Sequence, residues 1–269
     1  AITGSTVTNS ATGTIRTTGG TSTLGSTVTN PAGGQMILNN ATALTLIGTL
    51  TNAGSLALNA AGNATDLVLS GNVTLTGGGT VTLSNSANNR IYGTVGTERL
   101  TTNNLIQGAG SLGLNLMFLT NSGTIRANVS STLTIDPTDG AGNAINTGTL
   151  EAVSGGTLTL SDGTFTNTGG IIRANASTVN VNSSTVTGGT LEGLGTSTVS
   201  LSSGTLSGVV TTVGSGSTLT VSGTGTSSGR VTVAAAGTLV ASSTAILVNV
   251  TGGTHNIANT GGQAIYDLA

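Results

Sequence analysis

Two glycine-containing motifs are the clearest chemical signals in the sequence. Gly108-Ala-Gly-Ser-Leu-Gly113 matches the dinucleotide-binding pattern G-x-G-x-x-G, and Gly225-Thr-Ser-Ser-Gly229 matches the nucleophile elbow G-x-S-x-G. Both kinds of site need a helix directly after the glycines. The residues that follow each motif show no helical periodicity. We therefore interpret the first motif as part of a strand-and-turn pattern and the second as a loop in a repeat.

The titratable residues are few and scattered. His255 is the only histidine, has no acidic residues near it in sequence, and is expected in a surface turn rather than at a metal. Asp136 and Asp139 could offer oxygens to calcium, but their spacing is not that of an EF-hand, and Pro137 and Gly140 favour an ordinary turn. Eight acids and six arginines spread along the chain do not predict a glycan-cleaving centre. The sequence thus predicts no catalysis, no cofactor and no metal.

Composition excludes several further classes of protein. The chain has 269 residues, of which 5% are charged and 1% aromatic, and its net charge is −2. Nucleic-acid binding needs clustered Lys and Arg, so we expect no nucleic-acid partner. No apolar run is long enough for a membrane helix, so no membrane insertion is expected. A hydrophobic content of 36% argues against disorder.

The residue types favour strands throughout. Thr, Val, Ile, Ser, Asn and Gly dominate, and these residues disfavour helix. Short alternating segments such as 131–135 and 81–83 are typical of strands, and clusters of Gly and Asn between them are typical of turns. The sequence predicts an all-β chain.

The strands belong to a repeat. The pattern Ser or Gly, then Thr, then Leu or Val begins at residues 131, 156, 177, 197, 217 and 237. One aliphatic element precedes it by about eight residues and another follows it by about seven. Each unit of about 20–23 residues therefore holds three short strands, and the chain holds about 12 units. The stretch 84–110 is the least regular, and 250–269 is an atypical terminal segment.

Three strands in so short a unit predict one coil of a right-handed parallel β-solenoid. Each strand pairs with its equivalent in the next coil, its aliphatic residue points inward, and the flanking Thr or Ser points outward. The core is then three stacked columns of Leu, Val and Ile. We expect residues 1–269 to form a single solenoid domain without a linker.

Several segments resemble the repeats of giant bacterial surface proteins. They are Asn63-Ala-Thr-Asp-Leu-Val-Leu-Ser-Gly71, Asn146-Thr-Gly-Thr-Leu-Glu-Ala152, and residues 75–84 and 104–113. The chain is similar to filamentous-haemagglutinin-like and autotransporter-passenger-like β-solenoid adhesins. This resemblance implies secretion and a place on the cell surface or in an extracellular matrix.

The predicted role is structural: an adhesin stalk, or a fibre subunit that stacks head to tail on further copies of itself or continues a longer array. A host or matrix glycan or protein could be the receptor, and the sequence does not identify it. One alternative is ice binding by outward Thr-x-Thr pairs at Thr132/Thr134, Thr157/Thr159 and Thr218/Thr220, in an array interrupted by Asn180, Ser200 and Val240. A second alternative is a glycan-binding or glycan-degrading β-helix.

Two side-chain ladders are expected along the coils. One consists of the asparagines that follow the aliphatic-Thr pair of the third strand: Asn9, Asn30, Asn52, Asn121 and Asn167. These should share one corner and form a ladder over the first three coils, with Gly188 taking this place later, because Asn tolerates left-handed turns and can hydrogen-bond to its stacked neighbour.

The second ladder is charged. The residue after the inward aliphatic of the first strand is Arg126, Glu151, Arg173 and Glu192 in successive coils. Alternating signs one strand spacing apart would attract, and we expect Glu151→Arg to destabilise the stack more at low salt than at high salt.

Overall fold

The computed structural model describes residues 1–242, 245–252, 254–258 and 265–268, and for 246, 248, 249, 254–258 and 265–268 it describes the backbone only. All regular structure in these residues is β-strand, and none of it is helix. Strands pair in parallel with the equivalent strands of the neighbouring coil. The predicted parallel β-solenoid is confirmed, with about 11 turns of about 21 residues each instead of the 12 expected.

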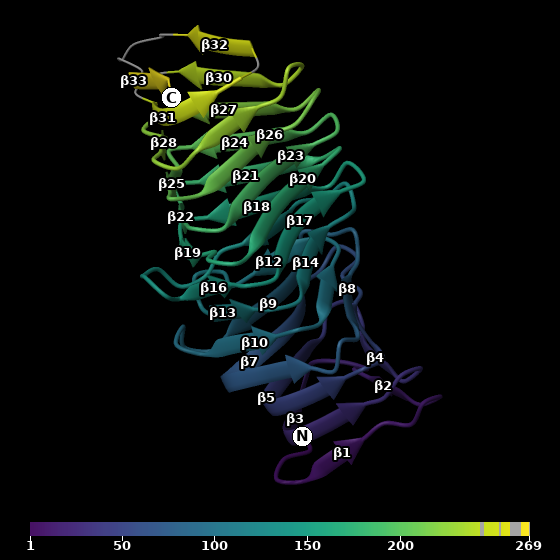
Figure 1. The fold of residues 1–269 in the computed structure, drawn as a ribbon. Helices are drawn as coiled ribbons and strands as arrows, with labels where there is room; N and C mark the ends of the chain where they lie inside the picture. The colour runs from purple at the N-terminus through teal and green to yellow at the C-terminus, as the bar shows by residue number, and fades with distance from the viewer. Residues whose placement is uncertain (243–244, 253, 259–264, 269) are drawn as a thin grey trace. The chain divides into compact units, whose positions relative to one another are not determined.

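The chain divides into two compact units, Ala1–Thr138 and Asp139–Ala269. In each unit the strands stack in layers, and each coil contributes to three sheets (Figure 1). We name these sheets A, B and C, and the strands of each unit follow one another along the chain in the order C, A, B.

In unit 1 the long strands β3, β5 and β7 bend from sheet B into sheet C, and the others belong to one sheet each. Sheet A holds β2 (Thr14–Arg16), β4 (Gln35–Leu38), β6 (Ser55–Leu58), β8 (Thr80–Leu83), β11 (Leu105–Gln107) and β14 (Thr124–Ala127). Sheet B holds the first halves of β3 (Thr21–Asn30), β5 (Ala43–Asn52) and β7 (Thr65–Thr76), then β9 (Asn89–Gly93), β12 (Gly110–Leu112) and β15 (Leu133–Ile135). Sheet C holds β1 (Thr6–Thr8), the second halves of β3, β5 and β7, then β10 (Arg99–Thr102) and β13 (Phe118–Asn121).

In unit 2 the strands are shorter and more regular. Sheet A holds β17 (Thr149–Val153), β20 (Ile171–Asn175), β23 (Thr190–Leu194), β26 (Val210–Val213) and β29 (Val231–Val233). Sheet B holds β18 (Thr157–Ser161), β21 (Thr178–Asn182), β24 (Thr198–Ser202), β27 (Thr218–Ser222), β30 (Thr238–Ser242) and β32 (Thr254–Ala258). Sheet C holds β16 (Ala144–Asn146), β19 (Thr164–Thr166), β22 (Thr185–Thr187), β25 (Thr205–Ser207), β28 (Thr226–Ser227), the start of β31 (Ile246–Thr251) and the start of β33 (Ile265–Leu268).

The strand register sets the length of each coil. Thr157 pairs with Thr178 and Thr178 with Thr198, so these two coils of unit 2 are almost equal in length. In unit 1 Asp66 pairs with Arg90, which makes a longer coil that leads into the irregular stretch. Thr238 pairs with Thr254, so the coil in the atypical terminal segment is shorter than either of these.

The core of each unit consists of stacked aliphatic columns. In sheet B of unit 2 the column is Leu158, Val179, Val199, Leu219 and Leu239, each at most 3% exposed. Thr or another residue with a short side chain lies on each side of these positions and faces outward, because successive side chains of a strand alternate between its two faces. The predicted inward columns are therefore present.

Close contact between coils explains the glycines of the G-x-G-x-x-G motif. Gly108, Gly110 and Gly113 all have positive φ, and a Cβ on any of them would lie 2.2 Å or less from a backbone carbonyl oxygen of another coil. Only glycine fits these positions. Gly110 begins the short strand β12, so the motif is part of the coil stacking and no helix follows it.

Candidate functional site

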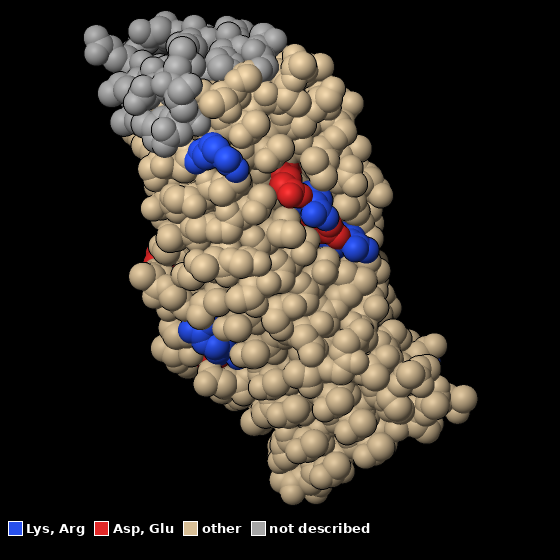
Figure 2. Space-filling model, viewed as in Figure 1, with Lys and Arg blue, Asp and Glu red and all other residues tan. Residues whose placement is uncertain are grey.

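The charged column of unit 2 lies on sheet A. Glu151 pairs with Arg173, and Arg173 pairs with Glu192 in the next strand. Arg173 Nε donates to Glu192 Oε2 at 2.8 Å, and Arg173 Nη1 lies 3.9 Å from Glu151 Oε2. Arg126 lies in β14 of unit 1, where it pairs with Gln107. Figure 2 shows acidic and basic side chains side by side on a surface that is otherwise almost uncharged.

A cluster that the sequence analysis missed lies on the outer face of sheet B in unit 1. Asp66 of β7 and Arg90 of β9 form a two-pronged ion pair, with N–O distances of 2.7 and 2.6 Å. The Tyr92 hydroxyl donates to Asp66 Oδ2 at 3.3 Å, and the Arg90 guanidinium lies 5.5 Å from the centre of the Tyr92 ring. Residues 66 and 90 are one coil apart, and the sequence indicates an ion pair between them only when the strand register is known.

The electrostatics of this cluster favour a fixed ion pair. The hydrogen bonds to Asp66 raise the pKa of the Arg90 guanidinium. Burial raises the pKa of the Tyr92 hydroxyl, and the negative charge of Asp66 adds to this effect. The Arg90 guanidinium therefore stays charged and the Tyr92 hydroxyl stays protonated at neutral pH, and the cluster joins neighbouring coils.

Buried asparagines form hydrogen-bonded chains at one corner of unit 1. Asn9 Nδ2 donates to Asn30 Oδ1 at 2.9 Å, and Asn30 Nδ2 donates to Asn52 Oδ1 at 2.7 Å. Asn30 Nδ2 also donates hydrogen bonds to the carbonyl oxygens of Gly34, at 3.2 Å, and Ser55, at 3.1 Å. None of these asparagines has positive φ, so the expected left-handed conformation is wrong and the side-chain bonds alone explain them.

Asn121 does not belong to this column. It pairs with Thr102, Thr102 pairs with Leu75, and Leu75 is the partner of Leu50. Asn121 is therefore stacked in the column of Leu50, two residues before the position of Asn52. The sequence alignment of Leu119-Thr-Asn121 with Leu50-Thr-Asn52 was wrong, because β10 follows the irregular turn after Gly93 and its register with β7 is shifted.

The same corner in unit 2 carries a shorter chain. Asn146 Nδ2 donates to Asn167 Oδ1 at 2.7 Å, and Asn167 Nδ2 lies 3.4 Å from the carbonyl oxygen of Gly188. Thr166 pairs with Thr187, which places Gly188 in the coil directly next to Asn167. Gly188 has φ 69°, a conformation that glycine adopts without strain.

Glu98 is a second group that the sequence did not indicate. Its side chain is buried, with a residue exposure of 3%, in the irregular turn between β9 and β10. Its carboxylate accepts hydrogen bonds from the Thr94 hydroxyl and from the backbone N–H groups of Val95 and Gly96. Burial alone would raise the pKa of Glu98, but these hydrogen bonds outweigh it and lower the pKa below its usual value.

The remaining candidates do not form a reaction centre in the described residues. Ser227 of the G-x-S-x-G motif is in strand β28 and 1% exposed, so it points into the core and not into a cleft. His255 lies in strand β32, where its backbone pairs with Leu239, and the expected surface turn is wrong. Within the part of the chain that the structure describes, no three His, Cys, Asp or Glu side chains come together as metal ligands would.

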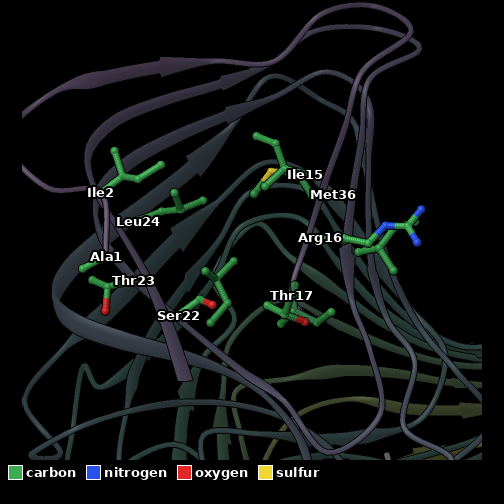
Figure 3. Close-up of a pocket in the computed structure, with 12 residues that line it drawn as sticks. Ala1, Ile2, Ile15, Arg16, Thr17, Ser22, Thr23, Leu24 and Met36 are labelled. Carbon is green, nitrogen blue, oxygen red and sulfur yellow. The ribbon is translucent and has the colours of Figure 1, made fainter. Parts of the chain in front are cut away.

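A cavity opens at the first coil of unit 1. It has a volume of about 230 Å³ and an apolar floor formed by Ile2, Ile15, Leu24 and Met36. Figure 3 shows Ile2 beside Leu24 and Ile15 beside Met36, with the Arg16 guanidinium pointing away from them. β1 pairs with β3 and β2 with β4, and neither has a second partner among the described residues.

Comparison with protein-family models, curated proteins and solved structures finds no match to this chain. No helix in the described residues is long and apolar enough to cross a membrane.

Proposed function

We propose that the chain is a structural segment of an extracellular β-solenoid, a surface adhesin stalk or a fibre subunit that stacks end to end, without catalysis. The repeated coil supports this proposal. In unit 2 the same Thr-Leu/Val positions pair across successive coils without a shift of register. Solenoids of this kind gain stability from each added coil and its contact with the next.

The observation that supports end-to-end stacking most directly is the open face of the first coil of unit 1. Among the described residues, β1 and β2 have no strand partner on their outer edges, and strand edges of this kind are templates for another strand. Ile2 is 51% exposed beside the apolar cavity. A further coil, from a second copy or from a longer repeat array, would have the same three-sheet outline, pair with these edges and bury the apolar side chains.

The proposed location is outside the cell, on the surface or in the matrix. The chain has no cysteine and few charged residues, and Thr, Ser, Asn and Gly make up more than half of it. Its resemblance to surface adhesins supports the same location. Under this proposal a receptor, if one is engaged, is a glycan or protein of the host or matrix.

Electron microscopy and sedimentation of the full chain test the stacking. We expect filaments whose length grows with protein concentration. Ile2→Glu places a charge at the open end and should abolish the filaments, whereas Ile47→Glu, at a 37% exposed position on the side of the coil, should leave them intact. Short separate particles at every concentration would rule out end-to-end stacking of separate copies.

A further inference from the structure

The outer face of sheet C in unit 1 carries two columns of threonine. Each of four successive strands presents a Thr-x-Thr pair, and the pairs are in register from strand to strand. The first column is Thr6, Thr27, Thr49 and Thr74, and the second is Thr8, Thr29, Thr51 and Thr76. Thr101 and Thr120 extend the first column by two more coils.

These threonines face away from the core. Between the paired threonines, Val28, Leu50 and Leu75 are at most 1% exposed and Val7 of the first coil is half-buried, so the flanking side chains must point outward. Thr6, Thr8 and Thr27 are exposed and the other five are half-buried. In the part of the chain that the structure describes, none of the eight hydroxyls hydrogen-bonds to a protein atom.

The array is more uniform than the one expected from the sequence. Thr157/Thr159 and Thr218/Thr220 do face outward on sheet B of unit 2, but Asn180 and Ser200 stand between Thr159 and Thr220 in that column. Thr132 precedes β15 and is outside the strand. In sheet C of unit 2, moreover, the Thr205 and Thr226 hydroxyls bond to each other at 3.2 Å.

The geometry of the unit 1 array fits ordered water. Neighbouring threonines in a column are one strand spacing apart, about 4.8 Å, and the two columns are two residues apart along the strand, about 6.6 Å. These two intervals lie close to the repeats of water molecules along two directions of the prism face of hexagonal ice. The χ1 angle of Thr is restricted, so the hydroxyls of one column can all point in the same direction. Each hydroxyl offers one donor and two acceptor positions to that water.

We propose that this face of unit 1 binds ice, with the two threonine columns replacing a row of water molecules at the ice surface. Methyl groups between the hydroxyls exclude loosely held water, and none of the eight positions carries a charge that would orient water differently. The proposal concerns the side of the coil and is independent of stacking through the coil edges.

Thermal hysteresis and inhibition of ice recrystallisation by the full chain test the proposal. We expect activity in the unmodified chain and a loss of at least tenfold in the double variant Thr29→Lys, Thr49→Lys. The matched control is Thr82→Lys, an exposed outward threonine of β8 in sheet A of the same unit, which should keep the full activity. Thermal unfolding by circular dichroism verifies that each variant is folded.

A more conservative variant distinguishes the effect of losing the hydroxyls from the effect of unfolding. Replacing Thr27, Thr29, Thr49 and Thr51 by Val keeps the β-branched shape and should lower the activity at least threefold. Failure of the unmodified chain to shape ice at millimolar concentration would overturn the proposal, as would an equal loss in Thr82→Lys. Filaments in the electron microscope would still be expected in either case, so the two proposals fail separately.

Discussion

Buried polar side chains in this protein differ in how well their hydrogen bonds are satisfied. Asn30 and Asn52 are fully buried in a hydrogen-bonded chain, and the Glu98 carboxylate is surrounded by donors. The Thr211 and Ser227 hydroxyls are buried and have no hydrogen-bond partner among the residues that the structure describes. A buried polar group is tolerated when it is bonded and costs stability when it is not. Substitutions at these residues should therefore change stability in opposite directions.

Glu98→Gln should destabilise unit 1 at neutral pH by about 2 kcal/mol, because a charged acceptor is replaced by an amide whose NH2 group faces backbone donors. The pKa of Glu98 is lowered in the folded chain, so its contribution is present above the unfolded pKa of about 4.3 and is lost as the pH falls through the folded value. Urea unfolding at pH 7 and at pH 2–3 measures this. The difference between variant and wild type should shrink in acid, and exposed Asp162→Asn should show little difference at pH 7. A constant difference at both pH values would mean that the charge is unimportant.

Asn30→Ala should cost about 2–3 kcal/mol, since it leaves the amides of Asn9 and Asn52 and two backbone carbonyls with fewer partners. The control is Asn59→Ala, at an exposed position of the same unit. Chemical unfolding compares the two free energies. Similar losses in both variants would show that the asparagine chain adds no stability of its own.

Thr211→Val and Ser227→Ala should each stabilise unit 2, by about 1 kcal/mol, because each removes a buried hydroxyl that has no hydrogen bond to any described residue. Thr211 stands between Leu191 and Val231, and Ser227 between Leu206 and Leu247, so an apolar side chain suits both columns. Thr212→Val, on the outward side of the same strand, is the control and should change little. A loss of stability in the two core variants would indicate that ordered water satisfies these hydroxyls.

At the scale of strands, the sequence predicts the elements well where the repeat is strict. The Thr-Leu/Val pattern of residues 157–239 identifies the strands of sheet B, because only one register buries all the aliphatic residues. The pattern misleads after Gly93, where the turn held by Glu98 shifts the register and moves Asn121 into another column. Nothing in the local sequence specifies how many residues such a turn absorbs. For the same reason the Asp66–Arg90 pair could not be found without the structure.

The charged column of sheet A gives a prediction about neighbouring strands. Arg173→Glu sets three carboxylates, at 151, 173 and 192, one strand spacing apart, and should destabilise unit 2 by about 1 kcal/mol at low salt. High salt should recover most of this loss, because these side chains are only partly buried and are screened. Arg173→Thr removes the charge without repulsion and is the control. Equal losses for Arg173→Glu at both ionic strengths would mean that packing, and not charge, decides the effect.

At the scale of the whole molecule, composition and repeat length were enough to predict the architecture. Few folds other than a parallel solenoid place three strands in a repeat of about 20 residues with so few charged side chains. The surfaces were harder to predict, because they arise between residues one coil apart. Thr6, Thr27, Thr49 and Thr74 form one column only through their register. The repeated Thr-x-Thr pairs were visible in the sequence, but their alignment depends on coil lengths that vary from one coil to the next.

Removing one complete coil tests whether each coil depends only on its neighbours. Thr178 pairs with Thr198, so deletion of residues 178–197 removes β21, β22 and β23 and brings β24, β25 and β26 against β18, β19 and β20 in the same register. Because the inward positions on both sides are apolar apart from Thr211, the shortened chain should fold with the same β-sheet circular dichroism and a modestly lower unfolding midpoint. Deletion of residues 178–187 removes only half a coil, brings strands of different sheets together, and should abolish cooperative unfolding of unit 2. If both deletions unfold unit 2 equally, its stability depends on long-range features of the chain and not on nearest-neighbour stacking.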